Sequence, residues 1–171
     1  APEDEQAKKL QDIGCIFIPI SIASRGTHPI QDLRLTYQLY RIYKKTHPDC
    51  IFHFTIKPNI YGSIAARIAG IPSISTVSGL GTVFLHKNIS SKIAKALYRF
   101  AFRFPKKVFF QNLDDLNLFV NQQLVISSLT SILPGSGIDT KKYSVAVFKK
   151  NNPYQFLFIG RLLYDKGIIE Y

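Results

Sequence analysis

The residues with the clearest chemical potential lie near the C-terminus, where a glycine and two cations follow an apolar run. The run 154–159 ends at Gly160, Arg161 follows directly, and Lys166 comes after four further residues. A strand that leads into such a loop, with a helix beginning beyond it, can hold a diphosphate. Guanidinium and ammonium groups pair with phosphate oxygens, and a helix N-terminus favours anions. We therefore expect Gly160, Arg161 and Lys166 to form a diphosphate site.

A second candidate site follows the apolar run 50–54. The loop contains Thr55, Lys57 and Asn59. Lys57 stands beside an expected helix N-terminus, so it can either bind phosphate or remain a solvated loop lysine. Pro58 lacks an amide donor, which weakens the backbone contribution to anion binding.

Two further loops combine glycines with hydroxyl groups. Glycine lets a ligand approach the backbone, whereas an ordinary turn or a flexible hinge needs the same residues. The loops contain Ser78, Gly79 and Gly81 after one run, and Gly135, Ser136 and Gly137 after another. Neither loop matches the dinucleotide fingerprint or the P-loop pattern.

The elements that must position these loops alternate along the chain. Apolar runs of strand length alternate with helical patterns, which predicts a doubly wound parallel α/β sheet with helices on both faces. The predicted strands are 14–20, 50–54, 72–77, 107–111, 130–133 and 154–159, and the predicted helices are 29–46, 59–69, 88–104 and 113–121. In such a sheet ligands bind beyond the carboxyl ends of the strands, where all four loops lie.

Three segments follow from this pattern. Residues 1–139 read as a Rossmann-like domain whose first strand is missing, because residues 1–11 look like the end of a preceding helix. Residues 140–153, with their lysines, asparagines and proline, read as a linker. Residues 154–171 then begin a second domain, so we expect the chain to be a piece of a longer enzyme.

Composition narrows the possible partners. The chain carries 22 Lys and Arg against 11 Asp and Glu, a net charge of +11 over 171 residues. Nucleic acid, an anionic membrane surface and phosphorylated substrates all fit this charge, but no nucleic-acid recognition motif appears. The cysteine and histidine spacings predict no metal site.

The predicted helix 88–104 combines apolar and basic faces. Its apolar stripe is expected to pack on the sheet, with Tyr98 and Phe102 pointing outward. The stripe is Ile89, Ile93, Leu97, Phe100 and Phe104, and the basic residues are Lys92, Lys95, Arg99, Arg103 and Lys106. Two interpretations stay open, a solvated basic face or a helix that meets an anionic membrane surface.

Taken together, the segments resemble family 4 retaining glycosyltransferases of the two-domain GT-B fold, in particular bacterial enzymes of capsule, O-antigen (lipopolysaccharide) and lipid-linked oligosaccharide synthesis. The matching motifs run in the family's order: Phe54–Gly62 (FTIKPNIYG), Ser78–Thr82 (SGLGT), Phe109–Asp115 (FFQNLDD), Leu133–Asp139 (LPGSGID) and Phe158–Gly167 (FIGRLLYDKG). The resemblance implies that Gly160, Arg161 and Lys166 hold the donor diphosphate, and that Gly135–Gly137 form a hinge or donor loop. It assigns Thr55, Lys57, Asn59, Ser78, Gly79 and Gly81 to the acceptor and the cleft. Ser78 lies near the position of a family histidine, so no catalytic residue is assigned.

The implied activity is transfer of a hexosyl or N-acetylhexosaminyl group from a UDP-sugar, with retention, to a lipid-linked or polysaccharide acceptor. The resemblance implies no cofactor and a cytoplasmic enzyme peripheral to the inner face of the cell membrane, with helix 88–104 on the anionic surface. We expect residues 1–171 alone to be inactive. Two alternatives remain, a nucleotide-sugar epimerase of the same fold and a non-catalytic basic module that binds a membrane surface.

Overall fold

The structure, a computed structural model, describes residues 5–22, 28–80, 84, 89–145, 153–160, 162 and 167–169. The chain divides into two compact units, Ala1–Gly135 and Ser136–Tyr171, and each is described by itself. All helices and strands within the described residues belong to the first unit.

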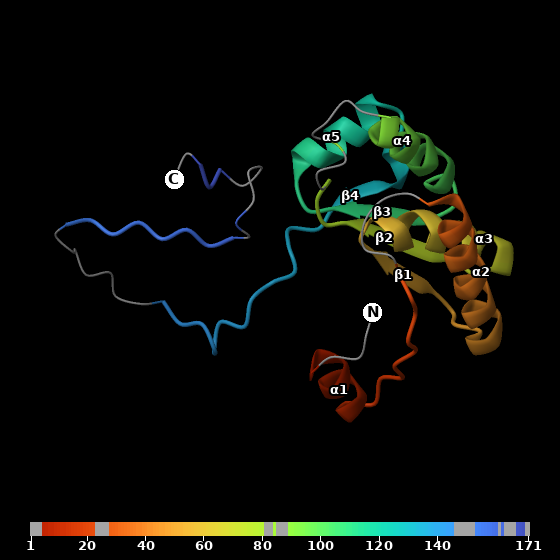
Figure 1. The fold of residues 1–171 in the computed structure, drawn as a ribbon, viewed down its shortest axis with the longest axis horizontal. Coiled ribbons are helices and arrows are strands. Elements are labelled where there is room, and N and C mark those ends of the chain that lie inside the picture. The colour runs from red at the N-terminus through yellow and green to blue at the C-terminus, as the bar shows by residue number, and fades with distance from the viewer. Residues whose placement is uncertain are drawn as a thin grey trace. The chain divides into compact units, whose positions relative to one another are not determined.

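A parallel four-stranded sheet forms the centre of the first unit (Figure 1). Its strands are β1 (Ile51–Phe54), β2 (Ser73–Val77), β3 (Lys107–Phe110) and β4 (Thr130–Ile132), in the order β1-β2-β3-β4. All three neighbouring pairs are parallel. Parallel neighbours need crossover connections, which helices supply here. The four strands predicted in this part of the chain are confirmed, and their ends differ by at most one residue.

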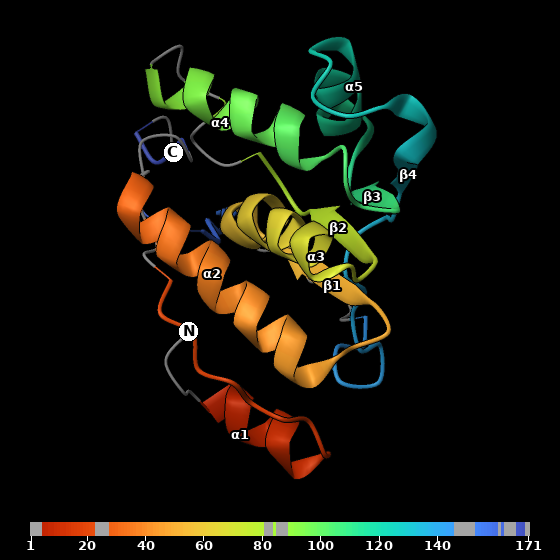
Figure 2. The same ribbon diagram turned by 90° about the vertical axis from the view of Figure 1, so that its right-hand side faces the viewer.

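One face of the sheet carries a layer of helices. They are α2 (Pro29–Thr46), α3 (Ser63–Ala69), α4 (Ile89–Ala101) and α5 (Leu113–Asn121). Figure 2 shows α2 and α3 side by side. Because the strands follow one another in a single direction, right-handed crossovers place α3, α4 and α5 on the same face.

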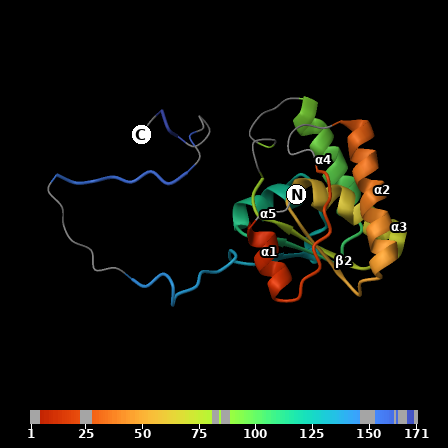
Figure 3. The ribbon, with the colours of Figure 1, turned by 60° about the horizontal axis from the view of Figure 1, so that its bottom comes forward.

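The opposite face of the sheet is more open. The short helix α1 (Glu5–Asp12) lies on this side (Figures 1 and 3). It leaves Phe52 and Phe54 of β1 exposed, at 62% and 55%. Among the described residues, α2, α3, α4 and α5 cover one face of the sheet, and only α1 lies on the side of the other.

Two of the predicted strands do not form. The described residues of 14–20 and of 154–159 have no strand pairing, and Ile16 and Ile159 are 89% and 86% exposed. An extended segment is stable only where a neighbour accepts and donates its ladder hydrogen bonds. Neither run belongs to the sheet formed by β1 to β4, so apolar composition alone does not produce a strand.

Helix α2 begins and ends as its sequence predicts. Pro29 occupies the first turn, and the C-cap His47 has left-handed backbone angles with φ 44°. His28 is the N-cap residue but makes no side-chain cap hydrogen bond. Instead the His28 backbone N–H donates to Asp32 Oδ2 at 3.2 Å. The Asp32 carboxylate thus satisfies the backbone N–H of the N-cap residue, as the acidic side chain of a capping box does.

Helix α4 packs by the face that we expected to point outward. Tyr98 and Phe102 are both 1% exposed, while Ile89 and Phe100 of the predicted packing stripe are 75% and 50% exposed. Tyr98 and Phe102 pack edge-on against each other, and Tyr98 also packs edge-on against Phe119 of α5. The packed face is thus the one that carries Tyr98 and Phe102, whose rings both contact Phe119.

A buried polar cluster supports the turn that follows β1. The His53 ring lies 3.0 Å from the Tyr43 hydroxyl and 3.4 Å from Ser63 Oγ, both within hydrogen-bond distance. Burial lowers the pKa of His53 to about 4, so the ring is neutral at pH 7. Gly62 lies directly against this ring.

We expect Gly62→Ala to lower the free energy of unfolding by about 2 kcal/mol, because overpacked cores lose about 1–3 kcal/mol. An added methyl group would stand 2.6 Å from His53 Nε2. Urea unfolding followed by circular dichroism measures the loss. The control is the same substitution in a His53→Ala background, where the ring no longer obstructs and the cost should nearly vanish. An equal loss in both backgrounds would contradict this explanation.

Candidate functional site

The candidate site lies at the carboxyl ends of β1 and β2. The pairing register sets Phe54 beside Thr76, so the turn that begins at Thr55 and the loop at Ser78 leave the sheet next to each other. Thr55, Ser78 and Gly79 are exposed. Gly81 lies outside the described residues. Two of the predicted loops therefore meet at the edge where parallel sheets bind ligands.

The turn after β1 has an unusual backbone. Thr55 has a φ of 68°, which is rare for a β-branched residue. The chain then forms a π-helical turn, Pro58–Gly62, before α3 begins. Left-handed β-branched residues and π turns both occur preferentially at functional sites.

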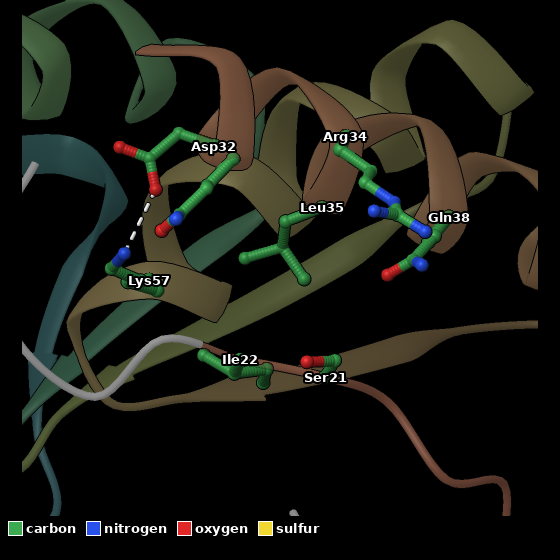
Figure 4. A pocket seen from close by; sticks show the side chains of 8 residues that line it. Ser21, Ile22, Asp32, Arg34, Leu35, Gln38 and Lys57 are labelled. Atoms are coloured by element: carbon green, nitrogen blue, oxygen red, sulfur yellow. Dashed lines mark hydrogen bonds and ion pairs between the residues drawn. The ribbon is translucent and has the colours of Figure 1, made fainter. Parts of the chain in front are cut away.

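Asp32 holds this turn to the start of α2. Asp32 is 5% exposed, and its carboxylate accepts hydrogen bonds from Lys57 Nζ and the Tyr61 hydroxyl, each at 2.8 Å. Figure 4 shows the Asp32–Lys57 ion pair reaching from the helix to the turn. The His28 N–H is the third donor to the same carboxylate. A nearly buried charge is stable only when it is paired and hydrogen-bonded, and these three donors meet that need.

Tyr61 is held as a neutral donor. Burial, together with the hydrogen bond to Asp32 and the negative charge of its carboxylate, raises the pKa of the Tyr61 hydroxyl well above its usual range. Its proton therefore stays on the hydroxyl, and the hydrogen bond to Asp32 persists at any pH near neutrality.

The predicted cleft residues of the turn differ in what they present to solvent. The Lys57 ammonium is paired with Asp32, so it is not the free cation that a solvated loop lysine would be. Asn59 is 1% exposed and lies beneath the turn, where its Nδ2 donates to the Thr76 carbonyl at 2.9 Å. Within the part of the chain that the structure describes, Asn59 Oδ1 has no hydrogen-bond partner.

A cavity of about 310 Å³ opens beside the ion pair (Figure 4). Helix α2 and the turn supply one side of it, and the segment at Ser21 and Ile22 supplies the other. Its lining residues are Ser21, Ile22, Gln31, Asp32, Arg34, Leu35, Gln38 and Lys57. Sequence reasoning missed all of these except Lys57. The i, i+3, i+7 spacing of Gln31, Arg34 and Gln38, which places them on one helix face, was the available clue.

The remaining predicted residues lie around the boundary of the two units or beyond it. Gly135 and Gly137 have φ values of 73° and 77°, which glycine adopts freely. Gly135 ends the first unit, and Ser136, Gly137 and Gly160 belong to the second. Arg161 and Lys166 lie outside the described residues.

Two searches of the described residues gave negative results. In the ranges that the structure describes, no three His, Cys, Asp or Glu side chains are grouped so that they could hold a metal ion. No described helix is both long and apolar enough to cross a bilayer.

Comparison with known proteins agrees with the ordered motifs. A family model described as "Glycosyl transferase 4-like" matches residues 1–112. An N,N'-diacetylbacillosaminyl-diphospho-undecaprenol alpha-1,3-N-acetylgalactosaminyltransferase from Campylobacter jejuni is 25% identical, over 99% of this chain and 50% of its own length. A UDP-Gal:alpha-D-GlcNAc-diphosphoundecaprenol alpha-1,3-galactosyltransferase from Escherichia coli is 27% identical, over 91% of this chain and 42% of its own length. The chain thus spans about half the length of these curated relatives.

Solved structures show the same fold. Anabaena HepE in complex with UDP and glucose matches 82% of this chain and 36% of its own, with a TM-score of 0.58 and 19% identity. Acinetobacter baumannii MurG matches the same shares with a TM-score of 0.50. Both are GT-B glycosyltransferases, so the predicted fold class is confirmed.

We expect the ion-pair residues to contribute unequally to stability. Asp32→Ala should lower the free energy of unfolding by about 3 kcal/mol, since it leaves the Lys57 and Tyr61 donors unpaired at once. Lys57→Met should cost about 2 kcal/mol, because Asp32 keeps two neutral donors but loses its counter-charge. Urea unfolding measures both, with exposed Asp49→Ala as a control that stays within about 0.5 kcal/mol of the wild type. Equal losses for Asp32→Ala and Lys57→Met would be inconsistent with a shared carboxylate.

Proposed function

The chain belongs to the glycosyl transferase 4-like family, and from that premise we propose that it is the N-terminal part of a retaining glycosyltransferase. The complete enzyme moves a hexosyl or N-acetylhexosaminyl group from a UDP-sugar to a lipid-linked or polysaccharide acceptor. The observation that carries this proposal is the family match over residues 1–112. Two curated relatives support it, since both names describe transfer to a sugar on diphospho-undecaprenol.

The proposed division of labour follows three segments. Residues 1–139 bind the acceptor, residues 140–153 link the domains, and residues 154–171 begin the nucleotide-sugar domain. The exposed edge formed by Thr55, Ser78 and Gly79 supports the acceptor role of the first segment. Asn59 is buried and supports this edge indirectly, because its hydrogen bond to the Thr76 carbonyl fixes the turn to β2.

The chemistry requires cations at the leaving group. As the sugar departs, negative charge grows on the donor diphosphate, and preorganised positive groups lower the barrier by stabilising that charge. We assign this role to Arg161 and Lys166, with Gly160 allowing the diphosphate to approach the backbone. Gly81 belongs to the acceptor loop, and Gly135, Ser136 and Gly137 form the hinge or donor loop. This mechanism uses no cofactor.

We also place the enzyme at the inner face of the cell membrane, with α4 on the anionic surface. The helix exposes Ile89, Ile93 and Phe100 at 75%, 42% and 50% on the side opposite its packed face. At helical spacing Lys92 and Arg99 lie on one side of this stripe, and Arg99 also donates to the Gln122 and Gln123 carbonyls. An apolar stripe beside a basic one fits the boundary between lipid headgroups and acyl chains. Each cation near such a surface contributes about 1 kcal/mol. The inserted residues are thus the stripe, and not Tyr98 and Phe102.

The proposed activity is tested by following transfer of radiolabelled sugar from UDP-sugars to a lipid-linked acceptor. The full-length protein that carries this chain should form product, and residues 1–171 alone should form none. Arg161→Gln should lower kcat by about 100-fold or more, as removal of one stabilising donor does elsewhere. Arg67→Gln, an exposed change on α3, is the control and should leave kcat unchanged. Transfer by residues 1–171, or no transfer by the full-length protein from any UDP-sugar, would refute the proposal.

Membrane docking is tested by sedimentation with vesicles of phosphatidylcholine alone or mixed with phosphatidylglycerol. The chain should bind only the anionic vesicles, and less tightly as salt rises. Replacing Ile89 and Phe100 with serine should weaken binding roughly tenfold or more, since both lose apolar burial in the membrane. The matched control replaces Ile68 and Ile126, which are 63% and 59% exposed elsewhere. A similar loss in both double variants would show that the stripe has no special role.

A further inference from the structure

The cavity beside α2 contains polar groups that the fold does not use. Gln31, Arg34 and Gln38 line it from one helix face. Within the described part of the chain, none of the three makes a side-chain hydrogen bond or an ion pair, whereas Asp32 and Lys57 in the same cavity are paired with each other. A guanidinium and two carboxamides are thus left free to bind something other than protein.

The two ends of the cavity carry different polar groups. Figure 4 shows Asp32 and Lys57 towards one end, Arg34 and Gln38 towards the other, and Leu35 between them. The Asp32–Lys57 pair is electrically neutral, so Arg34 leaves the cavity with one net positive charge. The opposite wall, at Ser21 and Ile22, adds a hydroxyl and an apolar side chain but no charge.

This set of groups favours a particular ligand chemistry. The planar fork of arginine binds two oxygens of a phosphate at once, and neighbouring amides add neutral donors. A volume of about 310 Å³ lies at the lower limit of small-molecule sites, so it suits a compact anion together with part of the group attached to it. Leu35 provides an apolar surface for that attached group.

We propose that this cavity is a second diphosphate subsite, in which Arg34 binds a phosphoryl group with help from Gln31 and Gln38. The inference rests on the proposed function, which supplies two sources of diphosphate, the nucleotide donor and the lipid-linked acceptor. It is separate from the donor site assigned to Arg161 and Lys166. Arg34 acts as a binding residue here and takes no part in bond breaking.

The test is an isothermal titration calorimetry experiment in which each of three probes is titrated into the 171-residue chain. They are inorganic pyrophosphate, UDP and a short-chain isoprenyl diphosphate. Pyrophosphate should bind, and Arg34→Gln should weaken its binding about tenfold or more, as loss of a charge-assisted hydrogen bond does. The control, Arg67→Gln, should change the affinity less than about twofold, because it removes an equal charge from an exposed site on α3. Circular dichroism checks that both variants fold.

The other two probes identify the source of the diphosphate. A loss on Arg34→Gln for the isoprenyl diphosphate but not for UDP assigns the cavity to the acceptor, and the reverse assigns it to the donor. Absence of pyrophosphate binding, or equal losses in Arg34→Gln and Arg67→Gln, would overturn the subsite. Sugar transfer by the full-length protein is measured separately. If transfer persists in Arg34→Gln with unchanged KM values for both the donor and the acceptor, the subsite alone fails and the proposed function stands.

Discussion

Burial of the Asp32 carboxylate is the constraint on which the candidate site depends. At 5% exposure this charge requires partners, and it takes them from the start of α2 and from the π-helical turn after β1. The same contacts fix the Lys57 ammonium and form the boundary of the adjacent cavity. Beneath the turn, the His53 ring packs so closely against Gly62 that an added methyl group would stand 2.6 Å from Nε2 and force a shift. An unfavourable backbone at Thr55 is thus maintained by interactions on both sides of the turn.

Local signals in the sequence predicted much of the fold. The bounds of α2 and α5 follow from their caps and periodicity, and four strands were found from apolar runs. The prediction of a strand at 14–20 was wrong because a strand needs a neighbouring strand to pair with. The apolar run alone cannot show whether such a neighbour exists. The predicted orientation of α4 was wrong for a related reason. Both sides of the helix are apolar, and only the aromatic cluster around Phe119 decides between them.

The candidate site was predicted in outline from the sequence. Loops at the carboxyl ends of parallel strands had to meet, and Thr55 and Ser78 do. The pairing of Lys57 with Asp32 joins residues 25 positions apart, which no local pattern reveals. Beyond this edge, the exposed stripe of α4 and the free side chains in the cavity are surfaces that the domain leaves available. An acceptor that is both lipid-linked and phosphorylated would use surfaces of these two kinds.

The most direct test of the account is a double-mutant cycle between Asp32→Ala and Tyr61→Phe, measured by urea unfolding. If the carboxylate joins α2 to the turn, the two changes remove one shared interaction, and the cycle should give a coupling energy of about 1 kcal/mol or more. A coupling within about 0.3 kcal/mol of zero would mean that the two residues act independently. That result would contradict the view that Asp32 organises this edge of the sheet.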